Sequence, residues 1–98
     1  MKILAIEKEI SGNSNNDYLP HMKTEALRVW ELYESEVIRE IYFDKIMHNA
    51  VIIMECKDIE EARANLETLP LVKEGLITFD YFALEPYTGF SRLFEQKE

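Results

Sequence analysis

The chain has 98 residues, 47% of them apolar, and its 19 acidic residues outnumber 11 basic ones to give a net charge of −8. This length is typical of one small domain, which gains stability from partner subunits. No stretch clusters the Lys and Arg that nucleic acid or anionic membranes require, so we expect neither as a partner.

The apolar residues are spread over short runs. No run reaches 18 residues, so no transmembrane helix is expected. The run at 1–6 is broken by Glu7, too early for a signal peptide. Cys56 is the only cysteine, which excludes an internal disulfide and favours a reducing, cytoplasmic location.

The first half of the chain predicts a strand, a loop and a helix. Residues 2–8 are a short apolar run bounded by charge, typical of a buried strand. Residues 10–17 are mostly turn formers and predict a loop. Pro20 suits a first helical turn, and helical spacing continues over 20–35. The apolar stripe of this helix consists of Met22, Ala26, Val29, Trp30 and Tyr33. Along its edge lie His21, Glu25, Arg28 and Leu32.

The second half predicts a hairpin, a helix and a last strand. Residues 37–43 and 49–56 are β-branched or apolar and read as two strands joined by a turn. The helix over 58–68 opens with an Asp in place of the usual Ser or Thr of a capping box. Residues 77–84 complete the set, and an aromatic-rich tail follows from Tyr87.

This order of elements predicts a ferredoxin-like α+β fold, β-α-β-β-α-β, with both helices on one face of a four-stranded antiparallel sheet. The strand at 49–56 is apolar on both sides, so the uncovered face needs a partner. We therefore expect two sheets to pack face to face in a homodimer. Residues 1–98 form a single domain, with the core in 1–86 and an apolar tail, 87–98, packing on the dimer.

From Glu36 to Phe82 the chain resembles muconolactone isomerase and its relatives in the dimeric α/β-barrel superfamily. The stretch Leu66-Glu67-Thr68-Leu69-Pro70-Leu71 matches the helix end before the family's last strand. The segments Val37-Ile38-Arg39, Asn49–Glu55 and Ile59–Ala62 align with two strands and a helix start. The resemblance implies a barrel made by two subunits, which could join into a larger ring of dimers, and an enzyme that moves a proton within a small unsaturated lactone.

Two regions depart from this family. The segment before Glu36 is acidic and different, and the tail Tyr87–Phe94 does not resemble the isomerase's polar ending.

Arg39 interrupts an apolar strand, with Val37 and Ile41 on its side of the pleat. Its guanidinium could bind a substrate carboxylate, or it could pair with Glu7 or Glu55. Those two carboxylates end neighbouring strands, where they could act as acid and base or simply be solvated or paired.

His21 and Glu25 are one helical turn apart and could move a proton or hold a ligand; otherwise His21 is a polar first-turn residue. The only other histidine is His48, so we expect no metal site. No glycine-rich phosphate loop is present, and we expect no cofactor.

The remaining candidates are aromatic and either line a pocket or belong to the core: Trp30, Tyr33, Tyr42 and Tyr81.

Three function classes follow. The first is a muconolactone isomerase-like protein that binds a small organic acid or lactone, with Glu25, Glu55 or His21 moving a proton and Arg39 fixing a carboxylate. The second is a cofactor-free monooxygenase of the same superfamily, which would have a dry aromatic pocket without charged residues. The third is a non-catalytic dimeric binding or stress protein, which would lack a cavity of about 300 Å³.

Overall fold

Four strands form one antiparallel sheet in the computed structural model, which describes residues 1–95. The strands are β1 (Lys2–Glu9), β2 (Ile38–Phe43), β3 (Ala50–Glu55) and β4 (Ile77–Leu84). Their order across the sheet is β2-β3-β1-β4, so β2 and β4 are the edges. All neighbouring pairs are antiparallel, which confirms the predicted arrangement.

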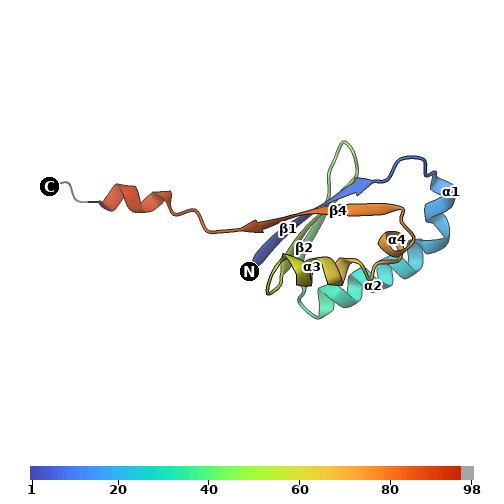
Figure 1. Ribbon diagram of the computed structural model, residues 1–98, viewed down its shortest axis with the longest axis horizontal. Helices are drawn as coiled ribbons and strands as arrows, with labels where there is room; N and C mark the ends of the chain where they lie inside the picture. The colour runs from blue at the N-terminus through green and yellow to red at the C-terminus, as the bar shows by residue number, and fades with distance from the viewer. Residues whose placement is uncertain (96–98) are drawn as a thin grey trace.

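The helices lie on one side of this sheet (Figure 1). They are α1 (Asn15–Tyr18), a 3₁₀ turn (Leu19–His21), α2 (Met22–Glu34), α3 (Ile59–Leu66) and α4 (Pro70–Lys73). The fold is thus the ferredoxin-like α+β fold. Two short helices were not predicted: α1 begins inside the expected loop, and α4 starts at Pro70, whose fixed φ suits a first helical turn. Within residues 1–95 no helix is long and apolar enough to cross a membrane.

The core lies between the sheet and the helices. Alternate strand residues point into it, among them Ile3, Ala5, Ile52, Met54 and Phe79. On the opposite side, the ladder aligns apolar side chains that no helix covers. We define this open sheet face by Leu4, Ile6, Val51, Ile53 and Phe82.

Helix α2 does not bury the side that its apolar stripe suggests. Leu32 is the buried residue, with 2% of its surface exposed, whereas Trp30 and Tyr33 are 54% and 48% exposed. Glu25 and Arg28 are half-buried. The residues expected along the edge of the stripe therefore face the core, and the aromatic residues face outward.

Strand β2 contains a bulge at Arg39. Ile38 pairs with Met54 of β3, but the next paired residue is Glu40, so Arg39 is an extra residue in the strand. The expected sharing of one side by Val37, Arg39 and Ile41 is wrong for this reason. Past the bulge, Ile41 faces the helices.

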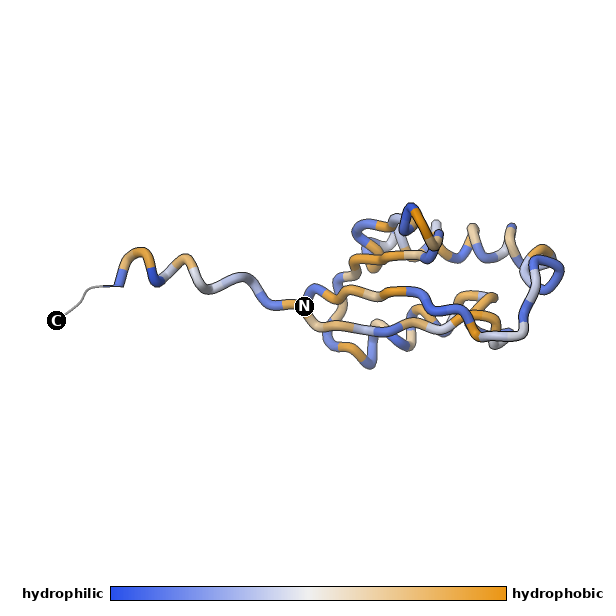
Figure 2. The backbone as a smooth tube through the Cα atoms, turned by 90° about the horizontal axis from the view of Figure 1, so that it is seen from above, coloured by the Kyte–Doolittle hydropathy of each residue, from blue (hydrophilic) through white to orange (hydrophobic). Residues whose placement is uncertain are grey.

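Residues 85–95 leave the end of β4 as an arm that leads away from the body (Figures 1 and 2). The molecule consequently measures 66 × 29 × 21 Å. The arm contains the 3₁₀ helix η2 (Gly89–Phe94). The packing of residues 87–98 on a dimer stays a prediction, and residues 96–98 lie outside the described residues.

Candidate functional site

A groove opens between α2 and the edge strand β2, with a cavity of about 500 Å³. A smaller hollow of about 300 Å³ continues it toward the end of the helix. We name the two together the α2–β2 groove. Its lining residues from α2 and the turn after it are Ala26, Val29, Trp30, Tyr33, Glu34 and Glu36. Its lining residues from β2 are Ile38, Arg39, Glu40, Ile41 and Tyr42.

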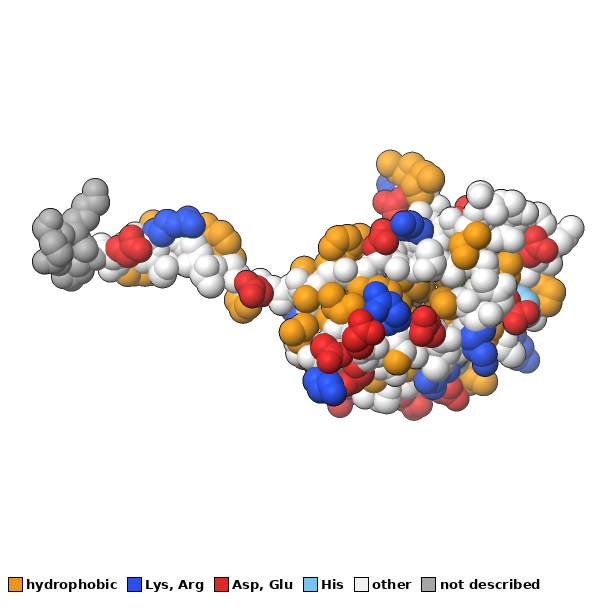
Figure 3. Space-filling model, viewed as in Figure 1, with side chains coloured by type: hydrophobic (Ala, Val, Ile, Leu, Met, Phe, Trp, Pro, Cys, Tyr) orange, Lys and Arg blue, Asp and Glu red, His pale blue; other side chains and the backbone are white. Residues whose placement is uncertain are grey.

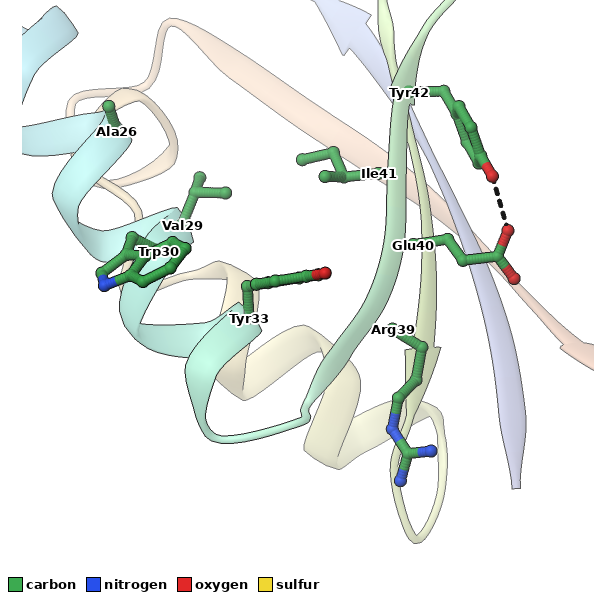
Figure 4. A pocket seen from close by; sticks show the side chains of 8 residues that line it. All are labelled: Ala26, Val29, Trp30, Tyr33, Arg39, Glu40, Ile41 and Tyr42. Atoms are coloured by element: carbon green, nitrogen blue, oxygen red, sulfur yellow. Dashed lines mark hydrogen bonds between the residues drawn. The ribbon is translucent and has the colours of Figure 1, made fainter.

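The outward turn of α2 gives the groove its aromatic wall. The Trp30 and Tyr33 rings lie 5.9 Å apart between centroids, tilted by 32°. Figure 4 shows Tyr33 pointing from the helix toward β2, and Ile41 pointing back toward the helix. An apolar slot with two ring faces suits a flat ligand.

Arg39 supplies the positive charge of the groove. Its Nε donates a 2.6 Å hydrogen bond to the carbonyl oxygen of Glu36. Glu36 itself has φ of 69°, the left-handed conformation that turns the chain from α2 into β2. None of the ion pairs found within residues 1–95 includes Arg39. The expected pairing with Glu7 or Glu55 is therefore absent there, and the Nη groups are available to an anion.

Glu40 and Tyr42 leave β2 on the side opposite the helix (Figure 4). The Tyr42 hydroxyl donates to Glu40 Oε1 at 2.6 Å. This hydrogen bond to the carboxylate is the main reason that the pKa of Tyr42 is raised. The two side chains border the groove as a hydrogen-bonded pair. Tyr42 shares its face of β2 with Glu40, whereas the bulge at Arg39 leaves Ile38 on the other face.

A second polar cluster lies where α2 begins. Glu25 Oε1 accepts a 2.9 Å hydrogen bond from the Leu71 amide at the start of α4. Burial raises the pKa of Glu25, and the charge of Glu7 raises it further, whereas the Leu71 hydrogen bond and His21 lower it. His21 Nε2 lies 3.9 Å from the Glu74 carboxylate.

Glu7 and Tyr18 belong to the same region. Glu7 faces the helix side, and its Oε1 accepts a 2.7 Å hydrogen bond from the Ala50 amide. The Tyr18 hydroxyl donates to the Leu76 carbonyl at 3.5 Å. Burial, then the charges of Glu9 and Glu7, raise the pKa of Tyr18. No local sequence pattern identifies Tyr18 as a member of this cluster. It lies near Glu7 only because the chain folds back after β1 and places α1 beside the end of that strand.

Glu55 and Tyr81 line neither place, although the Glu55 amide donates to the Val37 carbonyl near the groove. Glu55 accepts from the Met1 amino group at 2.5 Å, and this contact is the main cause of its lowered pKa, which the charge of Arg39 also helps to lower. The Tyr81 ring packs under Arg63 of α3, whose guanidinium carbon is 5.1 Å from the ring centroid. Burial raises the pKa of Tyr81 to about 12. Both side chains have local structural partners.

The structure thus gathers four of the predicted residues, Trp30, Tyr33, Arg39 and Tyr42, around one groove. It places His21, Glu25 and Glu7 in the separate cluster. Sequence reasoning missed several groove residues, and only their closeness in the chain to Trp30 and Arg39 could have suggested them: Ala26, Val29, Glu40 and Ile41. Within residues 1–95, no group of three or more His, Cys, Asp or Glu could hold a metal ion.

No family model matches the chain, and no curated protein sequence matches it significantly. Its fold is similar to that of the 5-chloro-2-hydroxyhydroquinone dehydrochlorinase from Burkholderia phenoliruptrix, solved in complex with 2,5-dihydroxybenzoquinone. The TM-score is 0.70 at 18% identity, over 91% of this chain and 98% of the other. The similarity shows the ferredoxin-like fold, in a small protein that binds a small molecule.

Proposed function

We propose that this protein binds a small unsaturated organic acid or lactone in the α2–β2 groove, as a muconolactone isomerase-like protein. The observation that carries the proposal is an apolar, aromatic cavity of about 500 Å³ bordered by a guanidinium that has no carboxylate partner within residues 1–95. Cavities of this size accommodate small molecules. The quinone in the similar dehydrochlorinase is also a small flat ring.

The ligand's flat part would lie against the Trp30 and Tyr33 rings, and its carboxylate or carbonyl oxygen would accept from the Arg39 Nη groups. A guanidinium binds carboxylates with two parallel hydrogen bonds, which fixes their orientation. Arg39 is itself held through Nε by the Glu36 carbonyl, so less of its freedom is lost when a ligand binds.

A proton-transfer step would use Glu25 or His21 rather than Glu55. These two residues belong to the separate polar cluster and would meet the ligand only at the Ala26 end of the groove. Glu25 directly precedes the groove residue Ala26, and its raised pKa keeps it protonated to a higher pH than an ordinary glutamic acid. Glu55 is turned to the other side of the sheet and bound to the Met1 amino group.

The charged lining of the groove favours this function over the two alternatives. A cofactor-free monooxygenase of the expected kind would have a dry aromatic pocket, whereas Arg39 and Glu40 line this one. A purely structural subunit would have no cavity above about 300 Å³.

We propose further that the protein acts as a homodimer through its open sheet face. Apolar side chains at the centre of this face, Leu4 and Ile53 among them, stay partly exposed in one chain. Contiguous apolar faces of this kind mark interaction sites in soluble proteins.

The test is a thermal-shift screen of small unsaturated carboxylic acids and lactones. We expect some acids to stabilise the protein, and Arg39→Ala to weaken their binding about 10- to 100-fold, since a hydrogen bond to a charged group contributes roughly 1.5–3 kcal/mol. Lys45→Ala is the control, because it removes one positive charge from the exposed hairpin turn. Equal shifts with Arg39→Ala, or no shift with any compound, would reject the proposal.

Acids found in this way can then be incubated in D₂O. Exchange of their carbon-bound hydrogens, lost in Glu25→Gln or His21→Gln, would support the isomerase-like chemistry.

A further inference from the structure

The arm at residues 85–95 carries apolar side chains that its own body does not cover. Figure 3 shows them spaced along the arm, apart from the rest of the molecule. Four are large and 65–79% exposed: Tyr87, Phe90, Leu93 and Phe94. The aromatic contact found in the arm is internal, an edge-to-face pair of Tyr87 and Phe90 at 4.9 Å and 85°. An arm of this composition is typical of a segment that docks on another surface.

The spacing of these residues fits a groove. Within η2, Phe90 and Leu93 stand one turn of 3₁₀ helix apart, and Phe94 follows Leu93, whereas Tyr87 precedes the helix. A short helical segment with apolar side chains can insert them between elements of a partner. The Tyr87 ring also lies over Gly89, where a Cβ atom would collide with it, so glycine allows the compact turn that brings the rings together.

The α2–β2 groove is open on the side where a ligand would be held. Trp30 is 54% exposed, Tyr33 48% and Ile41 38%. Small-molecule sites bury about 70–90% of the surface of their ligand. One wall of this site is therefore missing from the single chain, and apolar rings would supply it.

One charge on the arm, that of Arg92, is opposite to the charges at the groove border, whereas Glu85 and Glu95 lie at the two ends of the arm segment. Among arm residues 85–95, Arg92 is the one basic residue. Glu34 and Glu36 line the groove, whereas the Glu40 carboxylate lies on the other side of β2. Opposite charges of this kind fix the register in which two surfaces meet.

We propose that the arm of one subunit docks in the α2–β2 groove of a second copy, with Phe90 and Phe94 closing the groove and Arg92 beside its acidic border. The inference deepens the function proposed above, since it completes the same small-molecule site with residues of a partner subunit.

Docking between copies is favoured over docking within one chain. The arm starts at the β4 edge, while the groove lies at the β2 edge, three strand spacings or about 14 Å away. Residues 85–88, which link β4 to η2, span at most about 14 Å when fully stretched. To reach the groove of the same chain, residues 85–88 would also have to turn back across the end of the sheet. Docking in the groove of a second copy does not depend on the length of this link.

Trp30 is the only tryptophan and lies in the groove, so its fluorescence reports docking. The acceptor is the full chain with Phe90→Ser and Phe94→Ser, which keeps Trp30 but has an impaired arm. The donor is the full chain with Trp30→Phe, which is silent but has an intact arm. On mixing, or refolding together, we expect the acceptor's emission to shift to the blue as the donor arm covers Trp30.

The control donor carries Trp30→Phe, Phe90→Ser and Phe94→Ser, and should cause no shift although it can still form the sheet-to-sheet dimer. A donor with Arg92→Glu should shift the emission less, and an acceptor with Glu34→Arg should restore the shift with that donor. The wild-type emission could also lie to the blue of the acceptor's emission and stay there on dilution. That result, combined with no shift on mixing acceptor and donor, would show docking within one chain and overturn the proposal. So would an unchanged emission in every mixture.

These outcomes are separate from those of the ligand screen. If no acid binds but the emission shifts on mixing, the arm docks and the proposed ligand class is wrong. If acids bind through Arg39 but no mixture shifts, the function stands and the arm proposal fails.

Discussion

The Glu25 carboxyl accepts a hydrogen bond from the Leu71 amide while lying half-buried near Glu7. Burial outweighs the hydrogen bond, so the pKa of Glu25 in the folded protein is above its usual value. A carboxyl of this kind contributes most to stability below its unfolded pKa. The contribution is lost as pH rises through the folded pKa.

Glu25→Gln should consequently gain stability relative to the wild type as the pH rises from about 4 to 7, because glutamine does not ionise and its amide oxygen can still accept from Leu71. Thermal melts across that pH range measure the difference. Glu34→Gln removes the same charge from the exposed side of α2 and should not show the trend. A difference between Glu25→Gln and wild type that is independent of pH would contradict the raised pKa.

The sequence could indicate some residues of the site but not their grouping. The one-turn spacing of His21 and Glu25 places them together because α-helix geometry requires it. Glu7 joins them only through the packing of β1 beneath α2, which no local pattern encodes. Arg39 was conspicuous as a charge in an apolar strand, but its partner, the Glu36 carbonyl, depends on a left-handed turn at a residue that is not glycine.

At the scale of elements, α2 shows where periodicity stops being informative. An apolar stripe and its flank both repeat at 3.6 residues, so the pattern shows that a face exists but not which side meets the sheet. Tertiary contacts decide it. Arg28 Nε donates to Thr68 Oγ1 at 2.7 Å, and Glu25 accepts from the Leu71 amide, so both residues bind the chain beyond α3. Leu32, one turn after Arg28, is buried in the core.

Leu32→Ala should destabilise the protein by about 2–5 kcal/mol, since it leaves a cavity in the core. Leu27→Ala makes the same chemical change on the same helix at a side chain that is 57% exposed, and should stay within about 0.5 kcal/mol. Urea unfolding of the two variants provides the comparison. Equal losses would mean that α2 is rotated differently from the structure described.

The start of α3 was predictable because its signal is local. Asp58 lies in extended backbone and its Oδ1 accepts a 2.8 Å hydrogen bond from the Glu61 amide, as the capping pattern predicts.

Asp58→Ala should cost about 0.5–2 kcal/mol by leaving this amide without its partner, and Asp58→Asn should recover most of the loss. The midpoint of thermal unfolding measures both. An alanine variant as stable as the wild type would show that the cap contributes little here.

For the whole molecule, the order of the elements was sufficient to predict the fold. Six segments in the order β-α-β-β-α-β have few ways to pair without crossing connections, and the short turn between β2 and β3 sets their antiparallel register. The arm was harder to predict. Its aromatic content indicated that it packs against another surface. Composition cannot tell whether that surface belongs to the same subunit or to a second one.

The open sheet face allows a test of the homodimer. We expect a scattering mass near twice 11.6 kDa at micromolar concentration, and Ile53→Lys, at the centre of that face, should reduce it toward one subunit because a buried lysine cannot be solvated. Ile46→Lys makes the same change at the hairpin tip, where the side chain is 89% exposed, and should leave the mass unchanged. A dimer that persists in Ile53→Lys would point to a different interface.

The bulge in β2 leaves Arg39 outside the pairing of the sheet. Its two neighbours, Ile38 and Glu40, pair with consecutive residues of β3. A chain without Arg39 would therefore close a regular ladder and keep every later side chain on its present face, whereas loss of Tyr42 would move Phe43 to the opposite face. Arg39 thus occupies a position where a deletion removes a positive charge from the groove and leaves the pairing register of the sheet unchanged.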